Sequence, residues 1–187
     1  MPIDRRPDAR ARPAASLPEP IWRSYRRPPA TIAPAHWRSW LLDRGSLTRR
    51  LQTLSGGHFR VEVLRQCIAA PRLSERRALG LPPRQLALIR EVLLRGRDQP
   101  WVFARSVLPL TSLSGRLRRW RKLDARPLGA RLFNYPHLRR GALEIASLRA
   151  AALPPPTATC IPLETGLWGR RSLFFVHAKP LLVCEIF

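Results

Sequence analysis

Alternation of apolar and polar residues along the chain predicts several β-strands separated by turn sequences. In the segment 58–67, Phe59, Val61, Val63 and Cys67 share one face, and most of the other face is polar. This pattern is typical of a strand with one buried face. The further segments with strand patterns are Leu86–Arg95, Trp101–Leu108, Gly141–Leu148, Leu167–His177 and Leu181–Phe187. Short turn sequences between the second and third strands, and between the last two, predict two hairpins.

Helix signals occur between these strands, as capping residues followed by apolar positions at helical spacing. The predicted helices are a short one from Trp37 to Leu42, one from Leu47 to Leu54 that Ser46 caps and Gly56 ends, one through Leu117 and Trp120 after the caps at 111–114, and one from Pro127 to Phe133. The basic segment Ser74–Arg77 is interpreted as a loop.

Antiparallel strands with helices grouped between them predict an α+β domain with a single antiparallel β-sheet, and not a parallel sheet of βαβ units. Residues 1–33 mix Pro, Arg and Ala without helix or strand periodicity, and we expect a disordered tail there. The domain is then expected to span residues 34–187. The segment Leu153–Thr159 contains three consecutive prolines, which cannot pair inside a sheet, so it is predicted to be a loop.

The formal net charge of the 187-residue chain is +22, which first suggests a nucleic acid or an anionic membrane as partner. Only Lys122 and Lys179 are lysines, and the arginines are spread along the whole chain among many Ala, Pro and Leu residues. This distribution favours a GC-rich coding bias over a selected basic patch, so nucleic-acid binding is the weaker interpretation. The same positive potential can steer a small anionic substrate toward a site.

The sequence has no apolar run long enough to span a bilayer, and residues 1–6 carry charges and a proline where a signal peptide has its apolar core. We therefore expect a cytoplasmic protein with no membrane span. Cys67, Cys160 and Cys184 are widely spaced and form no C-x-x-C pair, so they are expected to be reduced thiols.

Motifs for common cofactors are missing from the sequence, which has no P-loop, no G-x-G-x-x-G after a strand, no H-E-x-x-H and no G-x-S-x-G. His36, His58, His137 and His177 occur singly, without metal-ligand spacing, and are interpreted as surface or capping residues. We expect neither a metal site nor an organic cofactor.

Two charged residues interrupt apolar faces of predicted strands. Arg90 shares a face with Leu88 and Val92, and Glu185 shares a face with Val183 and Phe187. A buried guanidinium or carboxylate is costly unless it is paired or bound to something. These residues could therefore pair with each other, lie on an exposed strand edge, or form an anion-binding site, and the pattern alone leaves these alternatives open.

The chain resembles the chorismate lyase family, because several short segments occur in that family's order over most of its length. These segments are Trp40–Asp43, Ser46–Arg50, Leu88–Leu94, Pro100–Arg105, Leu113–Gly115, Pro127–Gly129, Gly166–Ser172 and Lys179–Phe187. The resemblance implies a single sheet with helical flaps on one side. It also implies an enzyme, chorismate pyruvate-lyase, that splits chorismate into 4-hydroxybenzoate and pyruvate without a metal or cofactor, as the first step of ubiquinone biosynthesis.

The resemblance also implies the site residues. Arg90 would hold the ring carboxylate, and Glu185 would contact the ring hydroxyl and share or relay a proton with it. Backbone N–H groups of Leu47 and Leu128 would supply further polar contacts from the flaps, whose apolar side chains exclude water. The alternative interpretation is that Trp168, Arg170 and Arg171 only shape the closing hairpin, and that Leu47 is an ordinary core leucine on a capped helix.

The same lyase-like fold also occurs as a small-molecule sensing domain in one family of bacterial transcription regulators. A non-catalytic domain that binds a small aromatic acid is therefore the alternative function. Residues 1–33 are too short and too rich in proline to form a DNA-binding module, which favours the enzyme. The expected partners are chorismate and 4-hydroxybenzoate, and we expect a monomer.

Overall fold

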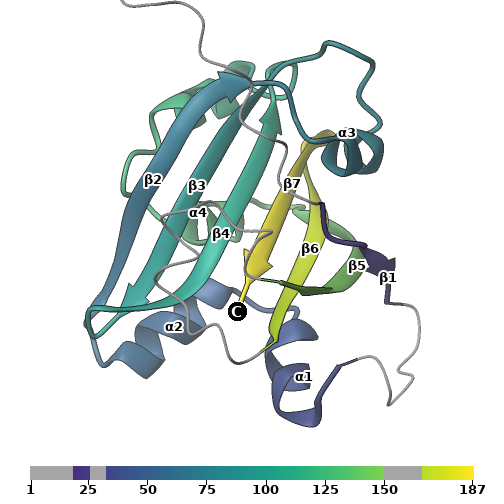
Figure 1. Ribbon diagram of the computed structural model, residues 1–187. Coiled ribbons are helices and arrows are strands. Elements are labelled where there is room, and N and C mark those ends of the chain that lie inside the picture. Colours follow the sequence, from purple (N-terminus) through teal and green to yellow (C-terminus); the bar gives the residue numbers. More distant parts are fainter. Residues whose placement is uncertain (1–18, 26–32, 150–165) are drawn as a thin grey trace, which may run out of the picture.

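A computed structural model describes residues 19–25, 33–149 and 166–187 of the chain. Within these ranges, seven antiparallel strands form one sheet in the order β1-β5-β6-β7-β4-β3-β2 (Figure 1). The strands are β1 (Arg23–Ser24), β2 (Phe59–Ala69), β3 (Ala87–Gly96), β4 (Gln99–Pro109), β5 (Arg139–Leu148), β6 (Leu167–Val176) and β7 (Lys179–Ile186). The helices are α1 (Ala35–Leu41), α2 (Leu47–Ser55), α3 (Leu73–Leu79), the 3-10 helix η1 (Gly115–Lys122) and α4 (Leu128–Leu132). The predicted α+β class with a single antiparallel sheet is confirmed.

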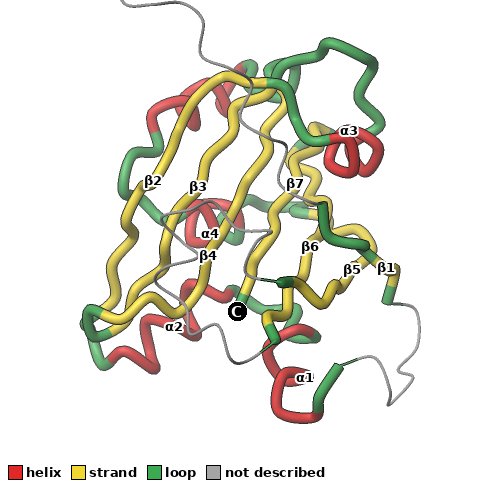
Figure 2. The backbone as a smooth tube through the Cα atoms, viewed as in Figure 1, coloured by secondary structure: helices red, strands yellow, loops and turns green. Residues whose placement is uncertain are grey.

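The central strands of the sheet are buried on both faces, because elements cover each side. Leu88 and Val92 of β3 face α1, α2, η1 and α4, whose apolar residues pack over this first face. Ile89 and Leu93 face the opposite side, which α3 and Trp22 cover. Figure 2 shows α2 and α4 behind the strands and α3 at the other side of the sheet near β7. The apolar character of both faces of β3 follows from this double cover.

Helix α2 begins and ends where its capping residues predict. The Ser46 hydroxyl accepts a hydrogen bond from the backbone N–H of Arg49 at 3.4 Å, as an N-cap does. Gly56 ends the helix with a φ of 62°, a left-handed conformation that glycine adopts without steric cost. Leu47 and Leu51 form the buried face of the helix. The helix therefore has a fixed start, which sets the position of Leu47.

Strand β2 departs from the predicted alternation. A β-bulge interrupts its pairing with β3 between Val63 and Arg65, which puts one extra residue into the strand. Phe59 accordingly packs with the first-face cluster, whereas Cys67 packs with the cluster on the opposite face. The prediction that Phe59 and Cys67 share a face is wrong, because a single inserted residue reverses the side to which all later side chains point.

Residues Leu73–Leu79 form α3, where the sequence predicts a basic loop. The Glu75 carboxylate accepts a hydrogen bond from the backbone N–H of Arg72 at 2.8 Å, which closes the first turn. The same carboxylate is buried against Arg105 of β4. The helix forms because Glu75 serves both contacts, and the second of them depends on a strand that lies far along the chain.

Residues 19–25 pack on the sheet, in contrast to the disordered tail predicted for 1–33. The Cζ atom of the Arg171 guanidinium lies 4.7 Å from the centroid of the Trp22 ring. The backbone N–H of Tyr25 donates to Leu143 O at 2.8 Å. The Glu19 carboxylate accepts from the backbone N–H groups of Leu73 and Ser74, both at 2.9 Å. The tail prediction fails over this short stretch, because its aromatic and acidic side chains find partners on the domain. The rest of the predicted tail, the predicted loop Leu153–Thr159 and Cys160 lie outside the described residues.

Among the helices of the described ranges, none has the length and apolar character that crossing a bilayer would require.

The second face of the sheet contains a buried ionic cluster. Arg105 donates to Glu75 Oε1 at 2.6 Å and to Glu91 Oε1 at 2.5 Å, and all three residues are less than 10% exposed. These two carboxylates raise the pKa of Arg105 above its usual value, although burial opposes them. The buried Arg105 cation is thus paired inside the protein, with two carboxylates as partners.

Replacement of Arg105 with Ala leaves two buried carboxylates without their cation, so we expect it to lower the free energy of unfolding by about 3–5 kcal/mol. Urea unfolding followed by circular dichroism measures this loss. The matched control is Arg95→Ala, which removes the partly exposed pair with Glu62 and should cost less than about 1 kcal/mol. Equal losses in the two variants would show that the buried cluster contributes no more to the free energy of unfolding than a partly exposed ion pair does.

Candidate active site

The four residues that the sequence nominates surround one small cavity between the first face of the sheet and the helices. Leu47 lies at the start of α2, Leu128 at the start of α4, Arg90 in the middle of β3 and Glu185 near the end of β7. The lining also includes Thr48, Val92, Leu94, Ala104, Ser106, Pro127, Gly129, Leu132, Phe133, Phe174 and Val183. The structure thus brings the four residues together, and their roles toward a substrate stay predictions.

Arg90 is a buried cation, with a relative exposure of 2%. Its Nη2 donates to the backbone carbonyls of Asp124 at 2.7 Å and Arg126 at 3.1 Å, and its buried Nε has no partner within the described residues. Burial lowers the pKa of Arg90 to about 10, and the nearby Asp124 carboxylate opposes this shift, so the guanidinium is charged at neutral pH. A buried charge with an unused N–H donor at a cavity is suited to bind an anion.

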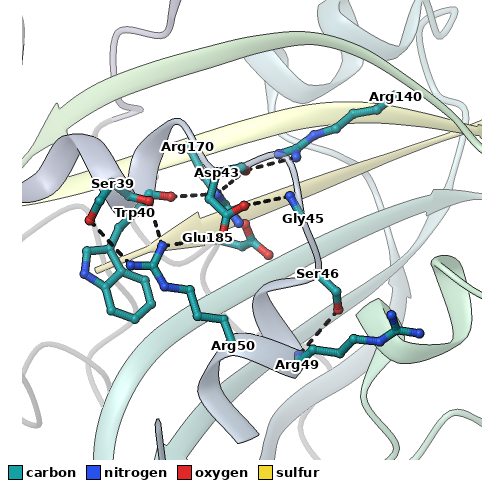
Figure 3. A network of polar contacts seen from close by, with 10 residues as sticks. All are labelled: Ser39, Trp40, Asp43, Gly45, Ser46, Arg49, Arg50, Arg140, Arg170 and Glu185. Atoms are coloured by element: carbon teal, nitrogen blue, oxygen red, sulfur yellow. Dashed lines mark hydrogen bonds and ion pairs between the residues drawn. The ribbon is translucent and has the colours of Figure 1, made fainter. Parts of the chain in front are cut away.

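Glu185 forms its ion pair with Arg170 and not with Arg90. The two residues lie opposite each other on β7 and β6, and Arg170 Nε donates to Glu185 Oε2 at 2.5 Å (Figure 3). The Glu185 side chain is 17% exposed and the Arg170 side chain is 2% exposed. Of the alternatives that the sequence leaves open, a direct Arg90–Glu185 pair is therefore excluded.

Leu47 and Leu128 are the first residues of α2 and α4. The N–H groups in the first turn of a helix have no acceptor within the helix, so the backbone N–H groups of both residues need acceptors from outside their helices. The two helices touch each other where Gly129 faces Thr48, because a Cβ atom at Gly129 would lie 2.7 Å from the Thr48 Oγ1. The close approach of α2 and α4 thus depends on a residue without a side chain, and together they cover the cavity.

The cavity has a volume of about 40 Å³. A cavity that accommodates a benzene ring has a volume of about 150 Å³. An aromatic ligand therefore does not fit into the cavity as it stands in this structure, and the residues around it have to move before one can enter. The segments that lie over the cavity are α2 and the stretch from η1 to α4, which we call the two flaps.

A larger groove, of about 530 Å³, lies beside the C-terminus. Its lining is apolar apart from Arg97 and includes Trp37, Trp40, Trp101 and Phe187. It is a weaker candidate for chemistry, because it combines no buried cation with a carboxylate. The smaller cavity has both.

Arg170, Thr48 and Ser106 are the polar residues at or beside the cavity that the sequence analysis missed. Arg170 gives a weaker signal than Arg90, because its neighbours on the same face are Trp168 and Ser172 and the next residue is another arginine, so the strand pattern does not single it out. Thr48 and Ser106 give no signal, because small hydroxyl residues are common in helices and strands.

Comparison with known proteins identifies the chain's relatives. The sequence profile described as "Chorismate lyase" matches residues 24–187. The chain belongs to the chorismate lyase family. A probable chorismate pyruvate-lyase of Alcanivorax borkumensis is 42% identical over 175 residues, covering 94% of this chain and 78% of the relative. A probable chorismate pyruvate-lyase of Azoarcus sp. is 45% identical over 167 residues, covering 86% of this chain and 87% of the relative.

Solved structures show the same fold as this chorismate lyase family member at low sequence identity. A transcriptional regulator of the GntR family from Bacillus cereus has a TM-score of 0.53 at 9% identity, covering 69% of this chain and 90% of that one. The C-terminal domain of a histidine utilization repressor from Pseudomonas syringae pv. tomato has a TM-score of 0.52 at 10% identity, covering 68% of this chain and 89% of that one. These likenesses concern the fold alone.

The contact between Gly129 and Thr48 gives a test of how the flaps close. Gly129→Ala forces the new methyl group against the Thr48 hydroxyl, and we expect it to lower the free energy of unfolding by about 1–3 kcal/mol. Thermal or urea unfolding measures the loss. In the double variant Gly129→Ala with Thr48→Ala the obstructing hydroxyl is gone, so most of the stability should return. A double variant as unstable as Gly129→Ala would contradict the packing described for α2 and α4.

Proposed function

We propose that this protein is a chorismate pyruvate-lyase, which converts chorismate into 4-hydroxybenzoate and pyruvate without a metal or an organic cofactor. The observation that carries the proposal is Arg90. It is a buried guanidinium that hydrogen-bonds to neutral carbonyls and has an unpartnered Nε within the described residues, at a cavity shared with Glu185. The membership in the chorismate lyase family supports the same substrate.

The ring carboxylate of chorismate is the anion that suits Arg90. A guanidinium presents its N–H donors in a planar fork that matches the two oxygens of a carboxylate. An anion at this position also raises the pKa of Arg90 back toward its ordinary value, because it offsets the effect of burial. The apolar residues Val92, Leu94 and Leu132 then enclose the ring.

The opposite end of the ring carries the hydroxyl group that becomes the phenol of the product. Glu185 is the carboxylate that lines the cavity, and its Oε1 can accept a hydrogen bond from this hydroxyl group and take up the proton that leaves the same ring carbon, while Oε2 is held by Arg170. The first-turn N–H groups of Leu47 and Leu128 add polar contacts from the flaps. This arrangement fixes both ends of a small aromatic acid.

The reaction requires one C–O bond to break and one proton to move. The ring carbon that carries the hydroxyl loses its hydrogen as a proton, the electron pair of that C–H bond makes the ring aromatic, and the neighbouring ether bond breaks. Enolpyruvate leaves and takes up a proton to become pyruvate, so atoms and electrons balance. Because aromatisation drives the elimination, the site has only to orient the ring, exclude water and manage the proton.

The wider setting follows from the same proposal. A lyase of this kind supplies 4-hydroxybenzoate for ubiquinone biosynthesis, and we propose that it acts in the cytoplasm as a monomer.

Incubation of the purified protein with chorismate tests the proposal, with 4-hydroxybenzoate and pyruvate measured separately by chromatography. We expect equal amounts of the two products with no added metal or cofactor. Binding of 4-hydroxybenzoate without turnover would contradict the lyase and support the alternative, a non-catalytic domain that binds a small aromatic acid. Absence of both turnover and binding would contradict both functions.

Arg90→Met should reduce kcat/KM by more than about 100-fold, because it removes hydrogen bonds from a charged donor to the carboxylate. We expect the free energy of unfolding to fall by no more than about 1–3 kcal/mol, since the Asp124 and Arg126 carbonyls lose a donor while the cost of burying the guanidinium disappears. Kinetics and urea unfolding of the same variant measure the two effects. A variant that loses stability and activity in parallel would make Arg90 a structural residue.

Glu185→Gln should lower kcat by at least about 100-fold if the carboxylate handles the proton, which is the lower range for general acid–base catalysis. The shape of the side chain is kept, so KM should change little. The matched control is Glu144→Gln, which alters the comparable ion pair with Arg171 on the neighbouring strands. Unchanged turnover in Glu185→Gln would remove the proton-handling role.

A further inference from the structure

Arg170 connects two parts of the site that are far apart in sequence. It lies on β6 directly opposite Glu185, and its Nε donates to Glu185 Oε2 at 2.5 Å. With a relative exposure of 1%, it is among the most deeply buried charged residues that the structure describes. The Cζ atom of its guanidinium lies 5.6 Å from the centroid of the Phe187 ring. Glu185 therefore has a partner that cannot turn away into solvent.

The other end of the same guanidinium holds the connection between α1 and α2. Arg170 Nη1 donates to the backbone carbonyls of Trp40 at 2.6 Å and Asp43 at 2.7 Å (Figure 3). Arg140 Nη1 also donates to Asp43 O, at 3.2 Å. The segment from Trp40 to Asp43 leads directly to Ser46 and Leu47, where α2 starts. Arg170 is thus bonded both to Glu185 and to the base of a flap.

Side-chain contacts make this connection stiff. The Asp43 carboxylate accepts from the backbone N–H of Gly45 at 2.7 Å, and its other oxygen lies 3.4 Å from Arg50 Nη1. Arg50 also donates to Ser39 O at 2.6 Å, and its Cζ atom lies over the Trp40 ring, 3.6 Å from the ring centroid. A shift of α2 is therefore transmitted to the carbonyls that Arg170 binds.

We propose that Arg170 is a positioning residue that couples the orientation of Glu185 to the closure of the flap that carries Leu47. A guanidinium is planar, so its Nε and Nη1 donors keep a fixed relation to each other. Glu185 is aligned toward the ring hydroxyl only when the α1–α2 connection is in place. This inference rests on the proposed function, in which Glu185 contacts the hydroxyl group of the ligand.

Two ligands that differ by one hydroxyl group separate positioning from general structural support. Both 4-hydroxybenzoate and benzoate carry the carboxylate for Arg90, and only the first offers a hydroxyl to Glu185. Isothermal titration calorimetry on the full chain gives the ratio of the two dissociation constants. For Arg170→Lys, which keeps the charge and loses the fork, we expect 4-hydroxybenzoate binding to weaken by about 10-fold and benzoate binding by less than about threefold.

The matched control is Arg171→Lys. Arg171 is the next residue on the same strand, is also buried, and pairs with Glu144 at 2.7 Å on the opposite face of the sheet. We expect this variant to keep the wild-type ratio of the two dissociation constants. A change in that ratio as large as that of Arg170→Lys would overturn the assignment to Arg170.

Asp43→Ala tests the coupling without altering a residue of the cavity or of the buried pair. The Asp43 side chain is 27% exposed, so the variant is expected to fold, and it loosens the α1–α2 connection. Preference for 4-hydroxybenzoate over benzoate should fall in the same direction as in Arg170→Lys. An unchanged preference in Asp43→Ala, or an equal loss of affinity for both ligands in Arg170→Lys, would overturn the coupling.

The wild-type protein distinguishes this failure from failure of the proposed function. If the wild type prefers 4-hydroxybenzoate and the Arg170 and Asp43 variants keep that preference, only the coupling is wrong. If the wild type neither binds 4-hydroxybenzoate more tightly than benzoate nor turns over chorismate, the proposed function is wrong and the coupling fails with it.

Discussion

The burial of the Arg90 guanidinium is the constraint on which the candidate site depends. A cation inside a protein needs acceptors, and the described residues offer Arg90 two backbone carbonyls, at Asp124 and Arg126. Those carbonyls belong to the segment between η1 and α4, so the same charge that is proposed to bind substrate also holds a flap over the cavity. Closure and anion binding thus depend on one side chain, which must stay charged and partly unpaired.

Two arginines on neighbouring strands show how the sheet separates stability from binding. Arg105 lies on the second face and meets Glu75 and Glu91, which makes a complete buried ionic cluster. Arg90 lies on the first face beside a cavity, and its described hydrogen bonds go only to neutral groups. A compensated charge contributes to the folded structure, whereas an uncompensated one is available to a ligand. Residue type alone does not distinguish the two, and only their partners do.

Much of the fold was predictable because it depends on local patterns. The hairpins follow from alternation and turn residues, and α2 follows from Ser46 and Gly56. Helix α3 was not predictable, because Glu75 needs Arg105 as its partner. The bulge in β2 was not predictable either, because Cys67 continues the spacing of Phe59 and Val61 although it packs on the opposite face. The packing of residues 19–25 likewise depends on partners in other parts of the chain, at Leu73 and Arg171.

The residues of the candidate site could be predicted from the sequence, but the contacts between their side chains could not. The apolar neighbours of Arg90 and Glu185 indicated burial, and the family resemblance added Leu47 and Leu128. The pairing of Glu185 with Arg170, and the link from Arg170 to the α1–α2 connection, arise where β6, β7 and α1 meet in space. Strand register determines that meeting, and no local pattern specifies it.

The most direct test of the account is a crystal structure of the protein with 4-hydroxybenzoate. The account predicts that the flaps enclose the ligand, that its carboxylate contacts the Arg90 guanidinium, and that its hydroxyl group contacts Glu185 while Arg170 holds the other oxygen of that carboxylate. A ligand bound instead in the groove lined by Trp37, Trp40 and Trp101, with the Arg90 cavity closed and unchanged, would contradict it.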